Sequence, residues 1–188
     1  MFDLIMINRL FSLLLLILFF PLLMIVALII IISNGFPIFY KQKRIGTNNV
    51  EFWIYKFRTM KKNVADIPTH LVDKNQQLYI YGGSLLRKFS MDEFPQLINI
   101  LKGEMTFIGP RPALYNQIDL IKLRTEIGIH KLRPGITGWA QVNGRDLLSI
   151  SQKVKLDKYY LDHQSLSLDL KIFFKTIYQF LSPKGILN

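Results

Sequence analysis

Two adjacent acidic residues form the part of this sequence that is best suited to chemistry. Asp92 and Glu93 lie in the stretch Ser90-Met91-Asp92-Glu93-Phe94-Pro95-Gln96. A carboxylate can attack phosphorus and form an acyl phosphate, and a neighbouring carboxylate can hold a hard divalent cation, which prefers oxygen ligands. Because the chain carries 24 basic but only 13 acidic residues, such a pair fits a substrate with several phosphate charges.

The same stretch also has a purely structural interpretation. Ser90 and Glu93 have the spacing of a capping box at the start of a helix, and the helix dipole favours acidic residues in a first turn. Pro95 complicates this register, because it falls either past the first turn, where it costs a hydrogen bond, or at the first helical position. In either register both carboxylates project from a helix start.

Basic residues are found where they complement the acidic pair, at a predicted strand end and in turns rich in proline and glycine. Arginine suits bidentate contact with phosphate, and flanking prolines limit how such a residue can move. Each of these residues taken alone is more often an exposed surface residue, so their placement in rigid turns is what favours ligand binding. The residues are Lys56, Arg58, Arg87, Arg111, Arg133 and Arg145.

The elements that must position these side chains are short. Residues 38–44 and 50–59 predict two strands around a turn at 46–49, and residues 133–145 predict a structured loop rich in glycine and proline. The other predicted elements are a polar loop at 61–77, short helices at 83–90 and 91–101, a strand at 105–108, and a helix over 113–132 interrupted at Gly128.

The tail, residues 150–181, predicts two helices broken near 163–167. In the second helix Leu170, Phe173, Ile177 and Phe180 recur at helical spacing, with Lys171 and Lys175 nearby. This pattern is typical of a helix in the lipid headgroup layer, and equally of a helix packed on the domain's own core.

The N-terminal part of the chain is apolar. Leu13 to Ile32 contains no polar residue, with Pro21 as its only helix breaker, and about 20 such residues suffice to cross a hydrocarbon core. No second run of this kind follows, which excludes a polytopic transporter, and the run itself excludes an ordinary soluble domain. The positive net charge of 11 lies entirely after residue 40, which indicates anionic partners.

Two arrangements of this run are open from the residues alone. The basic cluster Lys41, Lys43 and Arg44 places the C-terminal part in the cytoplasm. A single spanning helix with a kink at Pro21 would leave Arg9 outside. A sharp bend at Pro21 would instead return both ends to the cytoplasmic face as a re-entrant hairpin.

Several classes of site are excluded or disfavoured. The chain has no cysteine and only three scattered histidines, so thiol catalysis and a His-rich metal site are not expected. It has no G-x-x-x-x-G-K-[ST], G-x-G-x-x-G, H-E-x-x-H or G-x-S-x-G motif and no Asp-x-Asp. A non-catalytic membrane-anchored protein that binds nucleic acid or an acidic partner, or a scaffold, remains the alternative, although no nucleic-acid motif or basic stripe supports it.

Five segments in order carry a family resemblance over nearly the whole chain. They are the apolar helix, Lys56-Phe57-Arg58-Thr59-Met60, Ser90 to Gln96, Leu101-Lys102-Gly103-Glu104-Met105-Thr106-Phe107-Ile108-Gly109-Pro110-Arg111-Pro112, and Arg133 to Arg145. The chain resembles the bacterial sugar transferase family, the small monotopic phosphoglycosyl transferases, in its minimal catalytic form. The family's membrane helix breaks at a Ser-Pro pair, where this chain has Phe20 and Pro21; an acid often follows three residues after the helix-start arginine, where this chain has Ser12.

The resemblance implies a mechanism and a set of site residues. Asp92 would attack the β-phosphate of a UDP-sugar and release UMP, and polyprenyl (undecaprenyl) phosphate would then take the sugar phosphate from the aspartyl intermediate. Glu93, with Asp92 sharing, would bind Mg²⁺. Candidate phosphate or nucleotide ligands are Lys56, Arg58, Arg87, Arg111 and Arg145.

The resemblance also implies an architecture and a location. It predicts a mostly helical α/β membrane-associated domain, with a re-entrant helix-break-helix at residues 1–35 and a cytosolic catalytic domain with short strands and interfacial helices at residues 36–188. The protein would act at the cytoplasmic face of the bacterial inner membrane, among its lipids and without nucleic acid. It would catalyse the first membrane step of polysaccharide or glycoconjugate synthesis, upstream of further glycosyltransferases.

Overall fold

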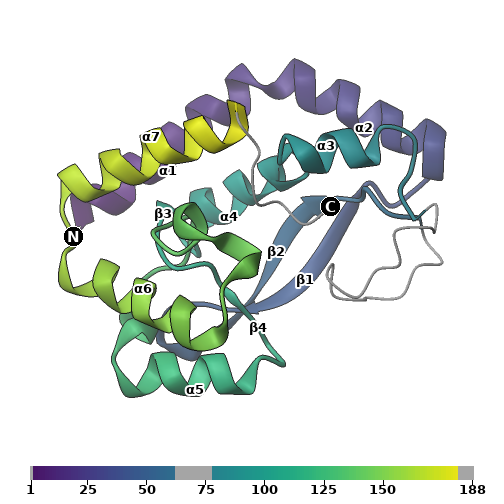
Figure 1. The fold of residues 1–188 in the computed structure, drawn as a ribbon. Helices are drawn as coiled ribbons and strands as arrows, with labels where there is room; N and C mark the ends of the chain where they lie inside the picture. Colours follow the sequence, from purple (N-terminus) through teal and green to yellow (C-terminus); the bar gives the residue numbers. More distant parts are fainter. Residues whose placement is uncertain (1, 62–77, 182–188) are drawn as a thin grey trace.

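A long β-hairpin and a bent pair of N-terminal helices frame the molecule (Figure 1). The computed structural model describes residues 2–61 and 78–181, and the polar loop predicted at 61–77 lies almost wholly outside that part. The described chain is a mostly helical α/β fold with two small sheets.

The apolar run forms two helices, α1 (Phe2–Leu18) and α2 (Phe20–Asn34), bent by 63° at their junction. Pro21 lies in the first turn of α2, where its missing N–H costs no helical hydrogen bond. Continuing α1 through it would drive its ring into a carbonyl of the preceding turn. In residues 2–61 and 78–181 no single helix has the length and apolar composition to cross a membrane, whereas the bent pair taken together fits a broken span or a re-entrant loop.

The helix α1 contacts the rest of the chain directly through α4 (Leu97–Lys102). The hydroxyl of Ser12, which is fully buried, donates to the Leu97 carbonyl at 2.6 Å. Arg9 Nη2 donates to the Lys102 carbonyl at 2.9 Å. Ser12 therefore joins the apolar run to the helix that follows the acidic pair.

The predicted hairpin is confirmed. Strands β1 (Phe39–Ile45) and β2 (Glu51–Phe57) pair antiparallel, from Phe39 opposite Phe57 to Ile45 opposite Glu51, around the turn η1 (Thr47–Asn49). The short strand β4 (Ala113–Leu114) pairs with the other edge of β1, giving the order β2-β1-β4. A second sheet pairs β3 (Thr106–Ile108) with β5 (Gly135–Thr137) in parallel.

The helix predicted over 113–132 is wrong at its start, and the predicted loop at 133–145 contains a strand. The helix α5 covers only Ile118–Glu126 and is followed by the 3₁₀ turn η4 (Ile129–Lys131). Ala113 and Leu114 are drawn into β4 by pairing with β1, and β5 forms because β3 lies beside it. Both are tertiary effects that override local pattern.

The remaining elements agree with the sequence more closely. Residues 91–102 form η3 and then α4, and the tail forms two helices with the break where it was predicted. Ser149 and Gln152 form a full capping box at the start of the first tail helix. These elements are α3 (Gly83–Lys88), η3 (Met91–Gln96), η5 (Gln141–Asn143), η6 (Arg145–Leu147), α6 (Ile150–Asp162) and α7 (Leu166–Leu181).

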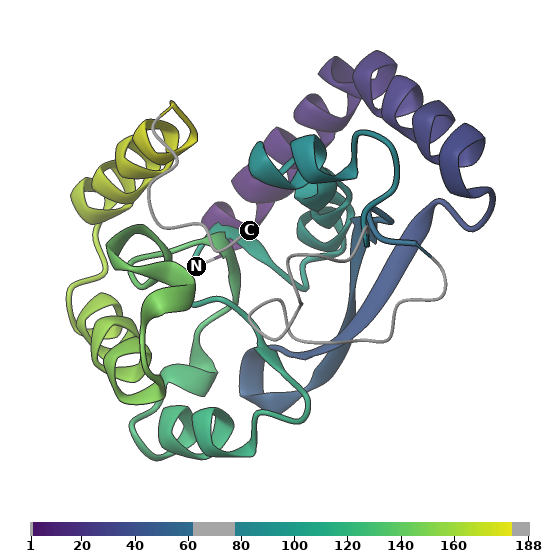
Figure 2. The same ribbon diagram turned by 45° about the vertical axis from the view of Figure 1, so that its right-hand side comes forward.

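Helix α7 has one buried and one exposed apolar face. Leu168 and Ile172 are buried in a cluster with Tyr160 of α6, whereas Leu170, Phe173 and Ile177 are 40–47% exposed. The core-packed interpretation is therefore wrong for these three residues. Figure 2 shows α7 and the α1–α2 pair as two separate arms at one end of the molecule.

Candidate active site

The acidic pair lies on η3, a 3₁₀ helix packed against β2. The capping box predicted for Ser90 and Glu93 is wrong. Ser90 has a φ of 50° and its side chain caps nothing; only its backbone carbonyl accepts from the Glu93 N–H, at 3.1 Å. The Glu93 side chain instead turns toward cations from distant parts of the chain.

Glu93 is the centre of a buried ion-pair network. Its Oε1 accepts from Lys56 Nζ at 2.7 Å and from Arg111 Nη2 at 2.9 Å. Burial alone would raise the pKa of Glu93, but the charges and hydrogen bonds of Arg111 and Lys56 outweigh it and hold that pKa well below its usual range. Glu93 is therefore ionised, with its charge compensated from two sides.

Asp92 is in a different environment, although it is the next residue. Only 8% of it is exposed, and its carboxylate has no hydrogen-bond or ion-pair partner among residues 2–61 and 78–181. Burial, followed by the charge of Glu93, raises the pKa of Asp92, while Lys56, Arg87 and Arg111 act in the opposite direction. The pair thus combines one carboxylate fixed by cations with one carboxylate that is not.

Strand β1 pairs with one edge of β2, and Asn99 binds the opposite edge, next to Lys56. Asn99, on α4 and fully buried, accepts from the Tyr55 N–H at 3.2 Å and donates to the Trp53 carbonyl at 2.7 Å. It also donates to Glu104 at 2.7 Å. The amide of Asn99 therefore takes the place of a neighbouring strand residue, and it fixes Lys56 relative to the helix that follows Glu93.

Arg111 is positioned by a turn held at several backbone atoms. The Gly109 N–H donates to the Thr137 carbonyl at 2.8 Å, and the Gly135 N–H donates to the Pro110 carbonyl at 3.0 Å. A Cβ at Gly135 would lie 2.2 Å from the Gly109 nitrogen, so the two backbones approach too closely for a side chain. This contact explains the glycines at positions 109 and 135, where β5 meets the turn Gly109-Pro110-Arg111-Pro112, which we call the arginine loop.

Arg44 of β1 also holds this turn, and the sequence analysis did not include it in the site. Its Nη1 donates to the Pro112 carbonyl at 3.0 Å. Burial, followed by the charge of Arg111, lowers the pKa of Arg44 to about 10. The charge of Glu93 therefore acts on three cations from three different segments, of which Lys56 and Arg111 donate hydrogen bonds to it.

A cavity of about 350 Å³ opens beside Glu93 and Arg111, and neither Asp92 nor Lys56 is among the described residues that line it. Its wall has a charged part with Glu93 and Arg111, an apolar part on the side of the α1–α2 bend, and a polar part contributed by α7 and η5. The lining residues are Leu15, Phe19, Ser90, Glu93, Phe94, Leu97, Phe107, Arg111, Ile136, Thr137, Gln141, Gly144, Arg145, Leu147, Thr176 and Gln179.

The other predicted ligands lie at different distances from the pair. Arg145, with a φ of 50°, lines the cavity. The Arg87 guanidinium lies over the Tyr79 ring, 5.4 Å from its centroid, and its charge acts on Asp92. In the described part of the chain, Arg58 neither lines the cavity nor contacts the pair.

A divalent cation would have to share its coordination with the substrate. Within the described ranges, no group of three or more His, Cys, Asp or Glu side chains could hold a metal. Mg²⁺ typically takes one or two protein carboxylates together with substrate phosphates. The adjacent carboxylates of Asp92 and Glu93, the first of them without a partner, fit that mode of binding.

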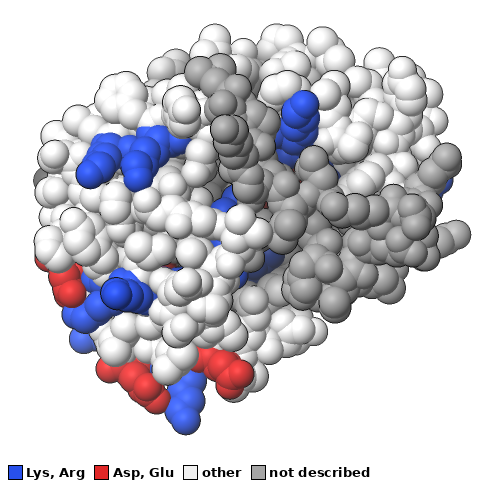
Figure 3. All heavy atoms as spheres, viewed as in Figure 1, with Lys and Arg blue, Asp and Glu red and all other residues white. Residues whose placement is uncertain are grey.

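Basic side chains are also present on the face of the molecule shown in Figure 3. In the view of Figure 3 the acidic side chains lie along the lower left and bottom edge, and basic side chains are spread over the face. Such a distribution favours the approach of anionic ligands.

Sequence reasoning missed four further residues around this site. Asn99 and Arg44 hold the strands and the turn described above. Gln141 is buried in the cavity wall, and neither of its side-chain polar atoms has a partner in the described residues. Arg124 contacts the arginine loop from behind. None of them has a local sequence pattern that reveals its role, because the contacts that connect Asn99, Arg44 and Arg124 to the site join residues 13 to 68 positions apart in the sequence.

Comparison with protein families gives a match over almost the whole chain. A model of the family described as bacterial sugar transferase matches residues 4–183. The match includes the bent helix pair, the acidic pair, the arginine loop and the tail helices.

Individual relatives agree with this match. The chain is 44% identical to the sugar transferase EpsL of Bacillus subtilis over 154 residues, which are 81% of this chain and 74% of that protein. It is 38% identical over 160 residues to the exopolysaccharide production protein ExoY of Sinorhizobium fredii, covering 77% and 70%. It is 34% identical over 164 residues to the UDP-glucose:undecaprenyl-phosphate glucose-1-phosphate transferase of Escherichia coli, covering 84% of this chain and 34% of that protein.

Proposed function

The chain belongs to the bacterial sugar transferase family, and on that premise we propose that it transfers a sugar 1-phosphate from a UDP-sugar to undecaprenyl phosphate. It is a transferase, as are relatives named undecaprenyl-phosphate sugar phosphotransferases. The alternative of a non-catalytic anchored protein has no comparable support. The products would be UMP and undecaprenyl-diphosphate-sugar.

The first step is attack by Asp92. A carboxylate oxygen forms a bond to the β-phosphorus of the UDP-sugar, and the bond from that phosphorus to the bridging oxygen breaks. UMP leaves with the electron pair. The sugar phosphate remains attached to Asp92 as an acyl phosphate.

The second step frees the enzyme. A phosphate oxygen of undecaprenyl phosphate attacks the same phosphorus, and the bond to the Asp92 oxygen breaks. The carboxylate is regenerated and the lipid carries the sugar through a new diphosphate. Because one product leaves before the second substrate reacts, the kinetics would be ping-pong.

The network around Glu93 orients the reacting groups. Lys56 and Arg111 compensate the charge of Glu93 and present positive charge to the transferring phosphoryl group. Arg145, Arg87 and Arg58 are the further candidate ligands for the donor's phosphates. When bound, Mg²⁺ would be held by Glu93 and Asp92 and would neutralise charge on the phosphates.

We further propose that the bent helices enter the cytoplasmic face of the inner membrane as a re-entrant unit at residues 1–35, with the catalytic domain at 36–188 on its surface. The 63° bend and the exposed apolar side chains of both helices support this. The exposed face of α7, with Leu170 and Phe173, would rest in the headgroup layer. The apolar part of the cavity, lined by Leu15 and Phe19, would then open toward the lipid acceptor.

The observation that carries the proposed reaction is the Asp92 carboxylate, which has no hydrogen-bond or ion-pair partner in the described residues, next to the compensated Glu93. The test is UMP release by detergent-solubilised protein with Mg²⁺, undecaprenyl phosphate and a panel of UDP-sugars. We expect release that needs the lipid, and a loss of about 10³-fold or more in Asp92→Asn. The matched control is Glu51→Gln, since Glu51 is exposed and its ion pair in the described part of the chain is with Lys43 on the surface.

Two results would contradict the proposal. Appreciable turnover in Asp92→Asn would remove Asp92 as the nucleophile. No UMP from any donor, together with no Mg²⁺-dependent binding of UDP-sugars, would contradict the reaction itself.

The membrane arrangement has a separate test. The chain has no cysteine, so single cysteines placed at positions 2 and 188 can be labelled selectively in cells. A re-entrant unit predicts that both label only after permeabilisation. Labelling of position 2 in intact cells would instead establish a spanning helix.

A further inference from the structure

A buried ion pair lies behind the arginine loop, outside the cavity. Arg124 of α5 donates from Nε and Nη2 to Asp157 Oδ2 of α6, at 3.0 and 2.6 Å. Asp157 is 1% exposed and Arg124 is 9% exposed. Burying two charges in this way has a desolvation cost that only good geometry and further hydrogen bonds offset. Arg124 makes one such further hydrogen bond, in addition to the two that it donates to Asp157.

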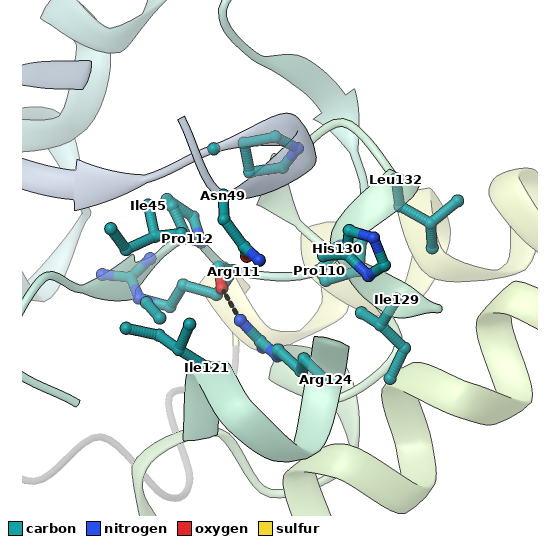
Figure 4. Close-up of a pocket in the computed structure, with 13 residues that line it drawn as sticks. Ile45, Asn49, Pro110, Arg111, Pro112, Ile121, Arg124, Ile129, His130 and Leu132 are labelled. Carbon is teal, nitrogen blue, oxygen red and sulfur yellow. Dashed lines mark hydrogen bonds between the residues drawn. The ribbon is translucent and has the colours of Figure 1, made fainter. Parts of the chain in front are cut away.

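That third contact reaches the backbone of Arg111. Arg124 Nη1 donates to the Arg111 carbonyl at 2.8 Å, the bond drawn as a dashed line in Figure 4. Arg111 lies between Pro110 and Pro112, whose rings fix φ on both sides. Pro112 also restricts ψ of Arg111, the residue before it, to the extended range, and within that range the hydrogen bond from Arg124 holds the orientation of the Arg111 carbonyl.

The same face of the loop has no room for a substrate. Arg124, the loop prolines and His130 line a space of only about 30 Å³, which has room for a few water molecules at most. Figure 4 shows Arg124 extending toward the loop from below, on the side of α5. Arg124 therefore acts on the loop and not on a ligand.

We propose that Arg124, oriented by Asp157, is a positioning residue for Arg111, and through Arg111 for Glu93. The chain of contacts runs from Asp157 to Arg124, to the Arg111 carbonyl, and from the Arg111 guanidinium to Glu93 Oε1 at 2.9 Å. This inference rests on the proposed function. Among the described residues, none of α5 or α6 lines the cavity. In this proposal the two helices instead hold the orientation of Arg111, which faces the phosphates.

The first variant is Arg124→Lys. It keeps the charge beside Asp157 but loses the planar fork that serves Asp157 and the Arg111 carbonyl at once. We expect kcat for UMP release to fall about 10- to 100-fold, because small misplacements of a charge-stabilising group are costly. The KM for the donor should change by less than about threefold, since the interaction is exerted mainly in the transition state.

The control for a merely structural effect is Tyr160→Phe. Tyr160 is buried on α6 beside the same core, and its hydroxyl donates to Asp169 at 2.8 Å. This variant should lose stability but keep kcat within about twofold. Asp157→Asn, which retains an acceptor for Arg124, should keep more activity than Asp157→Ala.

A double-mutant cycle identifies the route of the effect. In an Arg111→Lys background, Arg124→Lys should lower kcat by less than about threefold further, because residues that act through one another are not additive. An equal loss in both backgrounds would overturn the proposal. So would wild-type kcat in Arg124→Lys.

A readout independent of activity completes the test. The Gly109 N–H, at the start of the loop, donates to the Thr137 carbonyl of β5, and its amide hydrogen exchange should accelerate about tenfold or more in Arg124→Lys. Exchange in Tyr160→Phe should remain at the wild-type rate. Unchanged exchange in Arg124→Lys would refute the positioning role, whereas absence of UMP release by the wild-type protein would refute only the proposed function.

Discussion

Replacing Glu93 by glutamine tests the ion-pair network at its centre. The substitution keeps the shape of the side chain and removes its charge. Lys56 and Arg111 both donate to the same Oε1, at 2.7 and 2.9 Å. In Glu93→Gln these two cations would remain close together without the charge of the carboxylate that both of them contact.

The expected loss of stability follows from burial. Breaking a buried ion pair costs about 3–5 kcal/mol, because the partner charge is left uncompensated. The Lys56 side chain is 15% exposed and that of Arg111 is 31% exposed, so solvent relieves part of the penalty. We therefore expect about 3 kcal/mol, which in a chain of this size lowers Tm by about 6–12 °C.

The assay is thermal unfolding in detergent, with Glu51→Gln as the matched control. Glu51 makes the same kind of contact with Lys43, at 2.9 Å, but the two side chains are 52% and 37% exposed. Such surface pairs contribute about 0–1 kcal/mol, so the control should lower Tm by less than about 3 °C. Glu93→Gln should also lower UMP release about 100-fold or more, since its partners face the phosphates. Equal Tm values for the two variants would refute the view that burial gives the Glu93 network its strength.

Three further predictions concern the surrounding framework. Asn99→Leu removes the amide that pairs with β2 and should cost about 3 kcal/mol, measured by denaturant unfolding; a loss below about 1 kcal/mol would show that water replaces these bonds. Gly135→Ala places a Cβ 2.2 Å from the Gly109 nitrogen and should lower the free energy of unfolding by about 3 kcal/mol or more. The control is Gly128→Ala, where the new Cβ meets no atom within 4 Å but φ is +83°, and this variant should lose about 1–2 kcal/mol. Burial raises the pKa of Asp169, so the folded state keeps this proton to higher pH than the unfolded chain and loses stability as pH rises above the ordinary aspartate range. The Tm of Asp169→Asn relative to the wild type should accordingly increase from pH 4 to pH 7, and a constant difference would contradict the shift.

The local elements of the fold were largely predictable. Alternation and a turn predicted the β1–β2 hairpin, and helical spacing predicted the two tail helices and their break. The apolar run and Pro21 predicted a bent helix. These predictions succeed because the spacing of apolar residues and the residue types of a turn are both set within a few consecutive positions of the sequence.

Elements that depend on a distant partner were not predictable. The strand β4 exists because Ala113 and Leu114 meet the free edge of β1, although their spacing continued a helical pattern. The strand β5 depends in the same way on β3. Ser90 has the sequence of a cap but a left-handed backbone, and the Glu93 side chain that would complete the capping box is engaged by Lys56 and Arg111.

For the site, the sequence by itself determined which chemistry was possible. Adjacent carboxylates in a basic chain indicate phosphate chemistry, and proline on both sides of Arg111 indicates a rigid loop. Only the tertiary structure decided how the parts combine. Glu93 meets Lys56 from 37 residues away and Arg111 from 18 residues away, and Arg124 and Asp157 complete the support from the opposite side. Such contacts depend on where strands and helices pack, which residue types and spacing do not encode locally.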